Sequence, residues 1–118
     1  MKLAVFILAL AVTGCTTVAD IEHTPATMSV MSGKSPQEYA ECLAGRIAKN
    51  RTPPQIEPHR DGLRVIVPQK FAGSQPTALV DIEKRSGGSS IKLFESGGNN
   101  PLRLKDIQHS VTACISGD

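Results

Sequence analysis

Cysteine is the residue type with the most distinctive chemistry in this 118-residue chain, which has three of them, Cys15, Cys42 and Cys114. A thiol can attack a substrate, bind a metal ion or form a disulfide. None of the three lies in a Cys-x-x-Cys motif, the usual local signature of redox catalysts. Because the number is odd, at least one cysteine must have a role other than an internal disulfide.

The three histidines give little support for a metal centre or a catalytic site. His23, His59 and His109 fall in three separate segments, so no two of them have the i, i+4 spacing of helical metal ligands. The run His59-Arg60-Asp61 contains a base and an acid, but adjacent turn residues point in different directions. Nucleophilic catalysis needs a Ser or Cys beside a His that a third group orients, and nothing indicates such an arrangement. We expect no metal, no cofactor and no enzymatic activity.

Charge and composition exclude further classes of function. The chain has 13 Lys+Arg and 11 Asp+Glu, a net charge of +2, without the basic stripe of a nucleic-acid binder. It has no Trp, and Tyr39, Phe71 and Phe94 are its aromatic residues beyond residue 15, too few to stack bases or sugars. We therefore expect no nucleic-acid partner.

The first residues have the pattern of an export signal. Lys2 supplies a positive charge, Leu3 to Val12 is an unbroken apolar run, and two small residues precede Cys15. A ten-residue helix rises only about 15 Å, half of the roughly 30 Å hydrocarbon core of a bilayer. The run is therefore too short for a transmembrane anchor, and residues 1–14 are expected to be a signal peptide that is removed.

The string Val12-Thr13-Gly14-Cys15 resembles the lipobox of bacterial lipoproteins, with Val12 in place of the more common Leu. The resemblance covers the signal region alone. It implies that Cys15 receives a diacylglyceryl group and becomes the first mature residue, which would anchor the chain to a lipid bilayer. Thr16 stands where lipoproteins of the inner membrane often carry Asp, so the resemblance favours the periplasmic face of the outer membrane, with the inner membrane as the alternative. An ordinary secretory signal with an incidental Cys15 is the other interpretation.

Acylation of Cys15 would leave Cys42 and Cys114 as a pair in an oxidising compartment, where a disulfide is the expected outcome. The alternatives are two buried thiols or a metal-binding pair, and the second lacks a nearby His pair or a second Cys pair. A bridge between residues so far apart in sequence would contribute roughly 4 kcal/mol of stability.

Residues 15–34 are expected to form a lipidated flexible tether, because they are rich in Thr, Ser and Ala and have no sustained apolar period. A tether of this length reaches roughly 25 Å. Met28, Val30 and Met31 could dock on a partner or on the domain itself, although isolated apolar residues in a linker are usually without such a role.

Residues 35–118 are expected to fold as one small domain. Ser35-Pro36-Gln37-Glu38 is a capping box, and the apolar spacing after it predicts a helix from Pro36 to Lys49. A second amphipathic helix is predicted from Pro101 until Gly117 stops it. Asp61-Gly62 and Ser86-Gly87-Gly88-Ser89 are typical of hairpin turns. The predicted strands are Gln55–Pro58, Leu63–Val67, Ala78–Arg85 and Ser90–Glu95.

These elements predict a two-layer α+β fold, a four-stranded antiparallel meander with both helices on one face (α-β-β-β-β-α) and a disulfide between the helices. Strand alternation assigns one set of residues to the face beneath the helices, namely Leu63, Val65, Val67, Val80, Ile82, Ile91 and Leu93. The opposite face is assigned Arg64, Ile66, Leu79, Asp81, Glu83, Lys92 and Phe94. Its alternating charges are typical of a solvated face. Ile66, Leu79 and Phe94 could form a docking patch on it, or could simply be scattered.

The sequence thus predicts a non-enzymatic lipoprotein that is bound to a bilayer through Cys15 and acts by contact with an envelope protein. It would serve an envelope or secretion assembly, or inhibit a periplasmic enzyme. The alternative is a periplasmic module that binds a small ligand or the cell wall through the outer face of the sheet.

Overall fold

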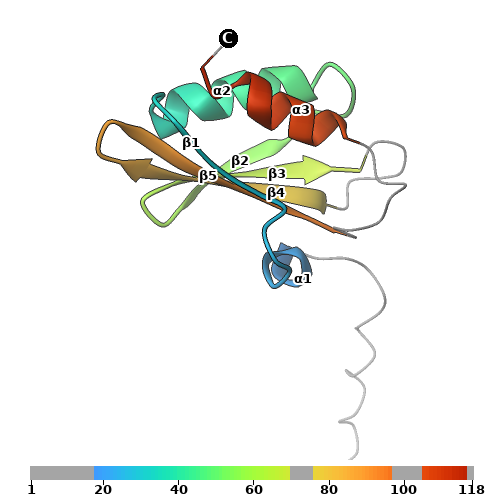
Figure 1. The fold of residues 1–118 in the computed structure, drawn as a ribbon. Coiled ribbons are helices and arrows are strands. Elements are labelled where there is room, and N and C mark those ends of the chain that lie inside the picture. The colour runs from blue at the N-terminus through green and yellow to red at the C-terminus, as the bar shows by residue number, and fades with distance from the viewer. Residues whose placement is uncertain (1–17, 70–75, 97–104, 117–118) are drawn as a thin grey trace, which may run out of the picture.

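The computed structural model describes residues 18–69, 76–96 and 105–116 (Figure 1). Helices and strands alternate irregularly along these segments. In chain order they are α1 (Val18–Glu22), β1 (Met28–Ser32), α2 (Pro36–Ile47), β2 (Gln55–His59), β3 (Gly62–Pro68), β4 (Pro76–Arg85), β5 (Gly88–Glu95) and α3 (Asp106–Ala113).

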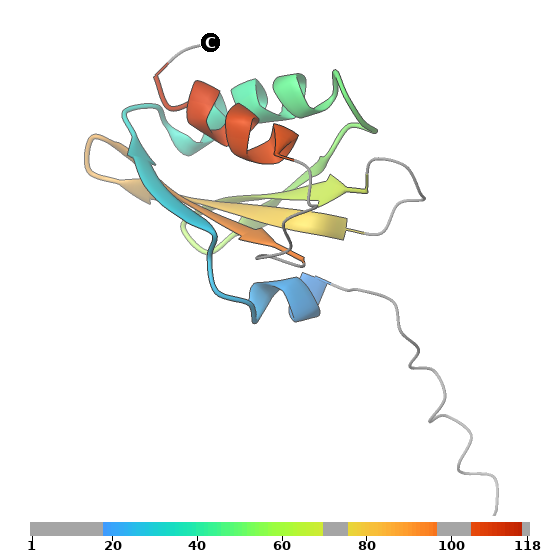
Figure 2. The same ribbon diagram turned by 45° about the vertical axis from the view of Figure 1, so that its right-hand side comes forward.

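The strands form one antiparallel sheet in the order β1-β5-β4-β3-β2. Helices α2 and α3 lie side by side over one face, and α1 lies on the opposite face (Figures 1 and 2). The predicted α+β class is confirmed, and β2 to β5 form the expected meander. The predicted strand number was wrong, because the sheet has a fifth strand, β1, on the open side of β5.

The fifth strand comes from the segment that we expected to be a flexible tether. Val30 lies opposite Ile91 in an antiparallel register, and Met28 and Val30 pack against the core. The Ser32 hydroxyl donates a hydrogen bond of 2.5 Å to the carbonyl of Ile115, beyond the end of α3. The described part of the folded domain therefore begins at Val18 and not at Ser35.

The core lies between the sheet and helices α2 and α3, as predicted. Six of the seven sheet residues assigned to this face are buried, and Leu63 packs partly buried against them. The helices contribute the buried residues Tyr39, Ala40, Leu43, Ile47, Ile107 and Val111. Strand alternation was sufficient to identify this face because one side of a pleated sheet is filled by every second residue.

The first predicted helix is confirmed. Glu38 and Ser35 form the predicted capping box, and α2 ends at Ile47, two residues before the expected end. The Tyr39 phenol is buried against α3 and donates a hydrogen bond of 2.6 Å to the carbonyl of Val111. Burial raises the pKa of Tyr39 above its usual value, so this phenol stays protonated as the donor. The predicted start of the second helix at Pro101 lies outside the described residues.

The predicted disulfide is confirmed. Cys42 of α2 and Cys114, directly after α3, are joined across 72 residues of sequence with an S–S distance of 2.02 Å and a Cα–Cα distance of 5.9 Å. The bridge links the two helices of the layer to each other, and Cys114 is fully buried in the core.

At two glycines, the backbone of a neighbouring strand lies too close for any side chain to fit. The β2–β3 turn is formed by Arg60 and Asp61, and the positive φ of 52° belongs to Arg60. Gly62, expected in the turn, is instead the first residue of β3, and a side chain there would collide with the carbonyl of Ile82. A side chain at Gly88 would similarly collide with the backbone of Ser32, so Gly88 allows β1 to join the sheet.

Candidate functional site

The outer face of the sheet, which carries Arg64, Leu79, Asp81 and Phe94 and lies opposite α2 and α3, is partly covered by α1 (Figure 2). Ile21 of α1 is buried although it lies outside the core cluster. Leu79 is 0% exposed, whereas Ile66 and Phe94 are half-buried. The expected docking patch at Ile66, Leu79 and Phe94 is therefore not an open surface, because the chain packs its own N-terminal helix against this face.

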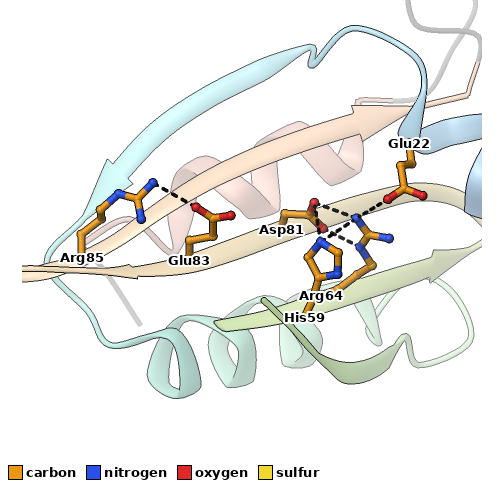
Figure 3. Close-up of polar contacts among 6 residues, drawn as sticks. All are labelled: Glu22, His59, Arg64, Asp81, Glu83 and Arg85. Atoms are coloured by element: carbon orange, nitrogen blue, oxygen red, sulfur yellow. Dashed lines mark hydrogen bonds and ion pairs between the residues drawn. The ribbon is translucent and has the colours of Figure 1, made fainter. Parts of the chain in front are cut away.

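A buried arginine is the centre of a charged cluster on the outer face (Figure 3). Arg64, 4% exposed, binds Asp81 through two hydrogen bonds, Nε–Oδ1 at 2.6 Å and Nη2–Oδ2 at 2.8 Å. Its Nη2 also lies 3.2 Å from Oε2 of Glu22 in α1 and 3.0 Å from Nε2 of His59. The hydrogen bond to Asp81 raises the pKa of Arg64, so the guanidinium remains charged.

Sheet register explains the cluster. Arg64 on β3 lies directly opposite Asp81 on β4, and Asp81 lies opposite Lys92 on β5. The alternation of charge across the strands was predicted, and Lys92 is exposed as expected. We expected Arg64 to be solvated, but it is buried, and Glu22 of α1 lies against its guanidinium. Arg64 thus links α1 to the sheet.

A second buried arginine holds the helix layer. Arg51, just beyond α2, binds both carboxylate oxygens of Asp106 at the start of α3, at 2.8 and 2.9 Å from Nη2. Its Nη1 donates a hydrogen bond of 2.8 Å to the carbonyl of Pro68 at the end of β3. Sequence reasoning missed this pair, because the partners are far apart in sequence and neither belongs to a recognisable motif. Its contacts all join parts of the fold, which indicates a structural role.

The structure does not bring the candidate chemical groups together. His23 and His109 are exposed in different elements, while His59 belongs to the Arg64 cluster. Within residues 18–69, 76–96 and 105–116, no three His, Cys, Asp or Glu side chains lie close enough to hold a metal ion. The Nε2 of His59 faces Arg64 and Asp81 and not a nucleophile. Cys15, the predicted lipidation site, lies outside the described residues.

Two shallow hollows open on the outer face. One, of about 240 Å³, is lined by Val18 of α1 and Ile66 of β3 together with prolines at the strand ends. The other, of about 160 Å³, lies between Arg60 and Phe94 and has charged walls, including Lys92. The larger hollow adjoins Val18, the first described residue of the chain.

The two edges of the sheet differ in character. On β2, Glu57 and Pro58 interrupt the edge with a charge and with a residue that has no N–H. On β1, the sequence Met-Ser-Val-Met-Ser contains no charge and no proline. Among the described residues, the large apolar side chains that are exposed are those of Met31 on β1, at 60%, and Ile56 on β2, at 41%. The β1 edge therefore lacks the features that usually prevent pairing with another strand.

Taken together, the fold and its disulfide define a small α+β domain in which the disulfide links the two helices of the helix layer. No protein-family model, no curated protein and no solved structure matches the chain. No helix in the described part of the chain is long and apolar enough to cross a membrane.

Proposed function

We propose that this protein is a bacterial lipoprotein, anchored to a bilayer through an acylated Cys15, that acts without catalysis by contact with an envelope protein. The observation that carries the proposal is the lipobox-like string Val12-Thr13-Gly14-Cys15 at the end of an apolar run of signal-peptide length. Several acyl chains hold a protein on a membrane far more firmly than one chain does.

The disulfide supports export. Bridges such as Cys42–Cys114 form and persist in oxidising compartments, including the bacterial periplasm, and are rare in the cytosol. Thr16, which follows the acylated cysteine, favours the periplasmic face of the outer membrane, and Asp at that position would favour the inner membrane.

A contact function is supported by the β1 edge. An uncharged edge strand can accept an extended segment of a partner through main-chain hydrogen bonds, and its exposed side chains then contribute specificity. Met31 is the side chain best placed for this, since it is 60% exposed on the outermost strand. Cys42 and Cys114 are joined and His59 is engaged by Arg64, so none of them is assigned a catalytic role.

Replacing Cys15 with serine should move the protein from the membrane fraction to the soluble fraction of lysed cells. A serine cannot accept the thioether-linked diacylglyceryl group, so the anchor would be lost. Immunoblots of the two fractions after high-speed sedimentation measure the result. A C15S protein that still sediments with membranes, or a wild-type amino terminus that mass spectrometry finds unmodified, would contradict the lipid anchor.

Met31→Lys should abolish crosslinking to an envelope protein that the wild-type chain captures in living cells. A lysine in the middle of an edge strand opposes strand addition, and this change leaves the core untouched. Ile56→Lys on β2 is the matched control, because it places the same charge at the other edge of the sheet. Equal capture by the M31K and wild-type proteins would exclude the β1 edge as the contact.

A further inference from the structure

We infer that the outer face of the sheet lies against the lipid headgroups and that α2 and α3 point away from the bilayer. The inference rests on the proposed lipid anchor at Cys15 and adds an orientation to it. It is argued from the position of Val18, the first described residue, and from the small number of residues between Cys15 and Val18.

The first step is the length of the connection. Cys15 precedes Val18, the first residue of α1, by three residues. A fully extended chain advances at most 3.3–3.6 Å per residue, so the connection spans about 10 Å. The flexible tether expected from the sequence would have reached more than twice as far. The folded domain is therefore held close to the headgroups.

The second step is the position of Val18 on the fold. Helix α1 is fixed to the outer face by the buried side chain of Ile21 and by the ion pair between Glu22 and Arg64. Val18 borders a hollow with Ile66 of the same face. The connection to the membrane thus leaves from the side of the sheet opposite α2 and α3, as Figure 2 shows for α1.

The third step compares the length of the connection with the thickness of the folded domain. Packed layers are separated by about 10 Å, and a helix with its side chains is about 10 Å in diameter. Bringing the far surface of α2 and α3 to the headgroups would require the connection to pass around the sheet and the helix layer, a distance of roughly 20 Å. A connection of half that length cannot do so. The outer face is the broad surface that remains.

The charges on this face place it at the headgroups and not in the hydrocarbon. Lys92 and Glu57 are exposed there, and charged side chains are costly within the membrane interior. Both signs are present, and the buried cation of this face, Arg64, is paired within the fold with two carboxylates, those of Asp81 and Glu22. Attraction to anionic lipid is therefore not the basis of the orientation, which should persist on zwitterionic vesicles and in high salt.

The test compares two exposed lysines in opposite layers, Lys92 on the outer face and Lys49 just beyond α2. Each is replaced by a fluorophore-labelled cysteine in the full lipidated chain, with the native disulfide intact. The protein is reconstituted into phosphatidylcholine vesicles that contain a nitroxide headgroup quencher. We expect several-fold stronger quenching at position 92 than at position 49, unchanged by high salt.

A flexible Gly/Ser insertion of about 20 residues between Thr17 and Val18 provides the control, because it extends the reach to roughly 25 Å. Quenching at the two positions should then become similar while the protein still floats with the vesicles. Equal quenching in the uninserted chain, or stronger quenching at position 49, would overturn the orientation and leave the anchor standing. A wild-type chain that does not float with the vesicles would overturn both.

Discussion

Replacing both Cys42 and Cys114 with alanine is expected to lower the free energy of unfolding by roughly 4 kcal/mol. The bridge closes a loop of 72 residues, and so removes a large part of the conformational freedom of the unfolded chain. Small domains are stable by only about 5–15 kcal/mol, so the loss is a large share of the total. Cys114 is also buried in the core, and its truncation removes packing as well.

Urea denaturation followed by far-UV circular dichroism measures this effect, since the chain has no Trp to serve as a fluorescence probe. Reductant provides the matched control. It should destabilise the wild-type protein by nearly as much as the double substitution does, and leave the C42A/C114A variant unchanged. A wild-type protein whose urea midpoint does not respond to reductant would show that the bridge contributes little to stability.

Helices α2 and α3 and strands β2 to β5 could be predicted because their signals are local. Ser35 and Glu38 form a capping box within four residues, and the alternation from Leu63 to Val67 indicates one buried face without knowledge of any neighbour. The disulfide was predictable for a different reason. Acylation of Cys15 would leave Cys42 and Cys114 as the remaining pair, and both predicted helices were placed on the same side of the sheet, where the two cysteines are joined.

Strand β1 could not be predicted in the same way because its stability comes from distant residues. Met28–Ser32 pairs with Leu93–Ser89 of β5, and no property of the five-residue segment alone requires that pairing. Two signals were present. Met28 and Val30 alternate as a half-buried strand does, and Gly88 leaves room for a neighbouring backbone that the hairpin alone does not require.

The outer face was misjudged for a related reason. Alternation correctly placed Arg64, Leu79 and Asp81 on it, but solvation was inferred on the assumption that nothing packs there. Helix α1 has only five residues and one buried apolar side chain, Ile21, so no amphipathic period identified it. Its position is set by Arg64, which satisfies carboxylates from two separate elements. The role of a charged residue in such a cluster depends on what the rest of the chain places beside it.

Substitution of Arg64 by methionine should lower the free energy of unfolding by about 3 kcal/mol, near the lower end for breaking a buried ion pair. We expect a value near the lower end because the side chain of Asp81 is 15% exposed, so water can partly hydrate the carboxylate that loses its partner. The variant leaves Asp81 without its two strong hydrogen bonds and releases Glu22, so α1 loses its polar attachment to the sheet.

Two further variants test whether the loss of stability comes from breaking the buried ion pair or from removing any arginine charge. Arg85→Met removes an exposed ion pair with Glu83, and should change stability by less than about 0.5 kcal/mol. Adding Asp81→Leu to Arg64→Met should recover much of the loss, because a buried pair replaced by apolar residues is often nearly neutral. If R64M is as mild as R85M in urea denaturation, the cluster does not hold α1. In that case the buried side chain of Ile21 would be what attaches α1 to the sheet. The membrane orientation would then be kept in R64M, so quenching should still be stronger at position 92 than at position 49.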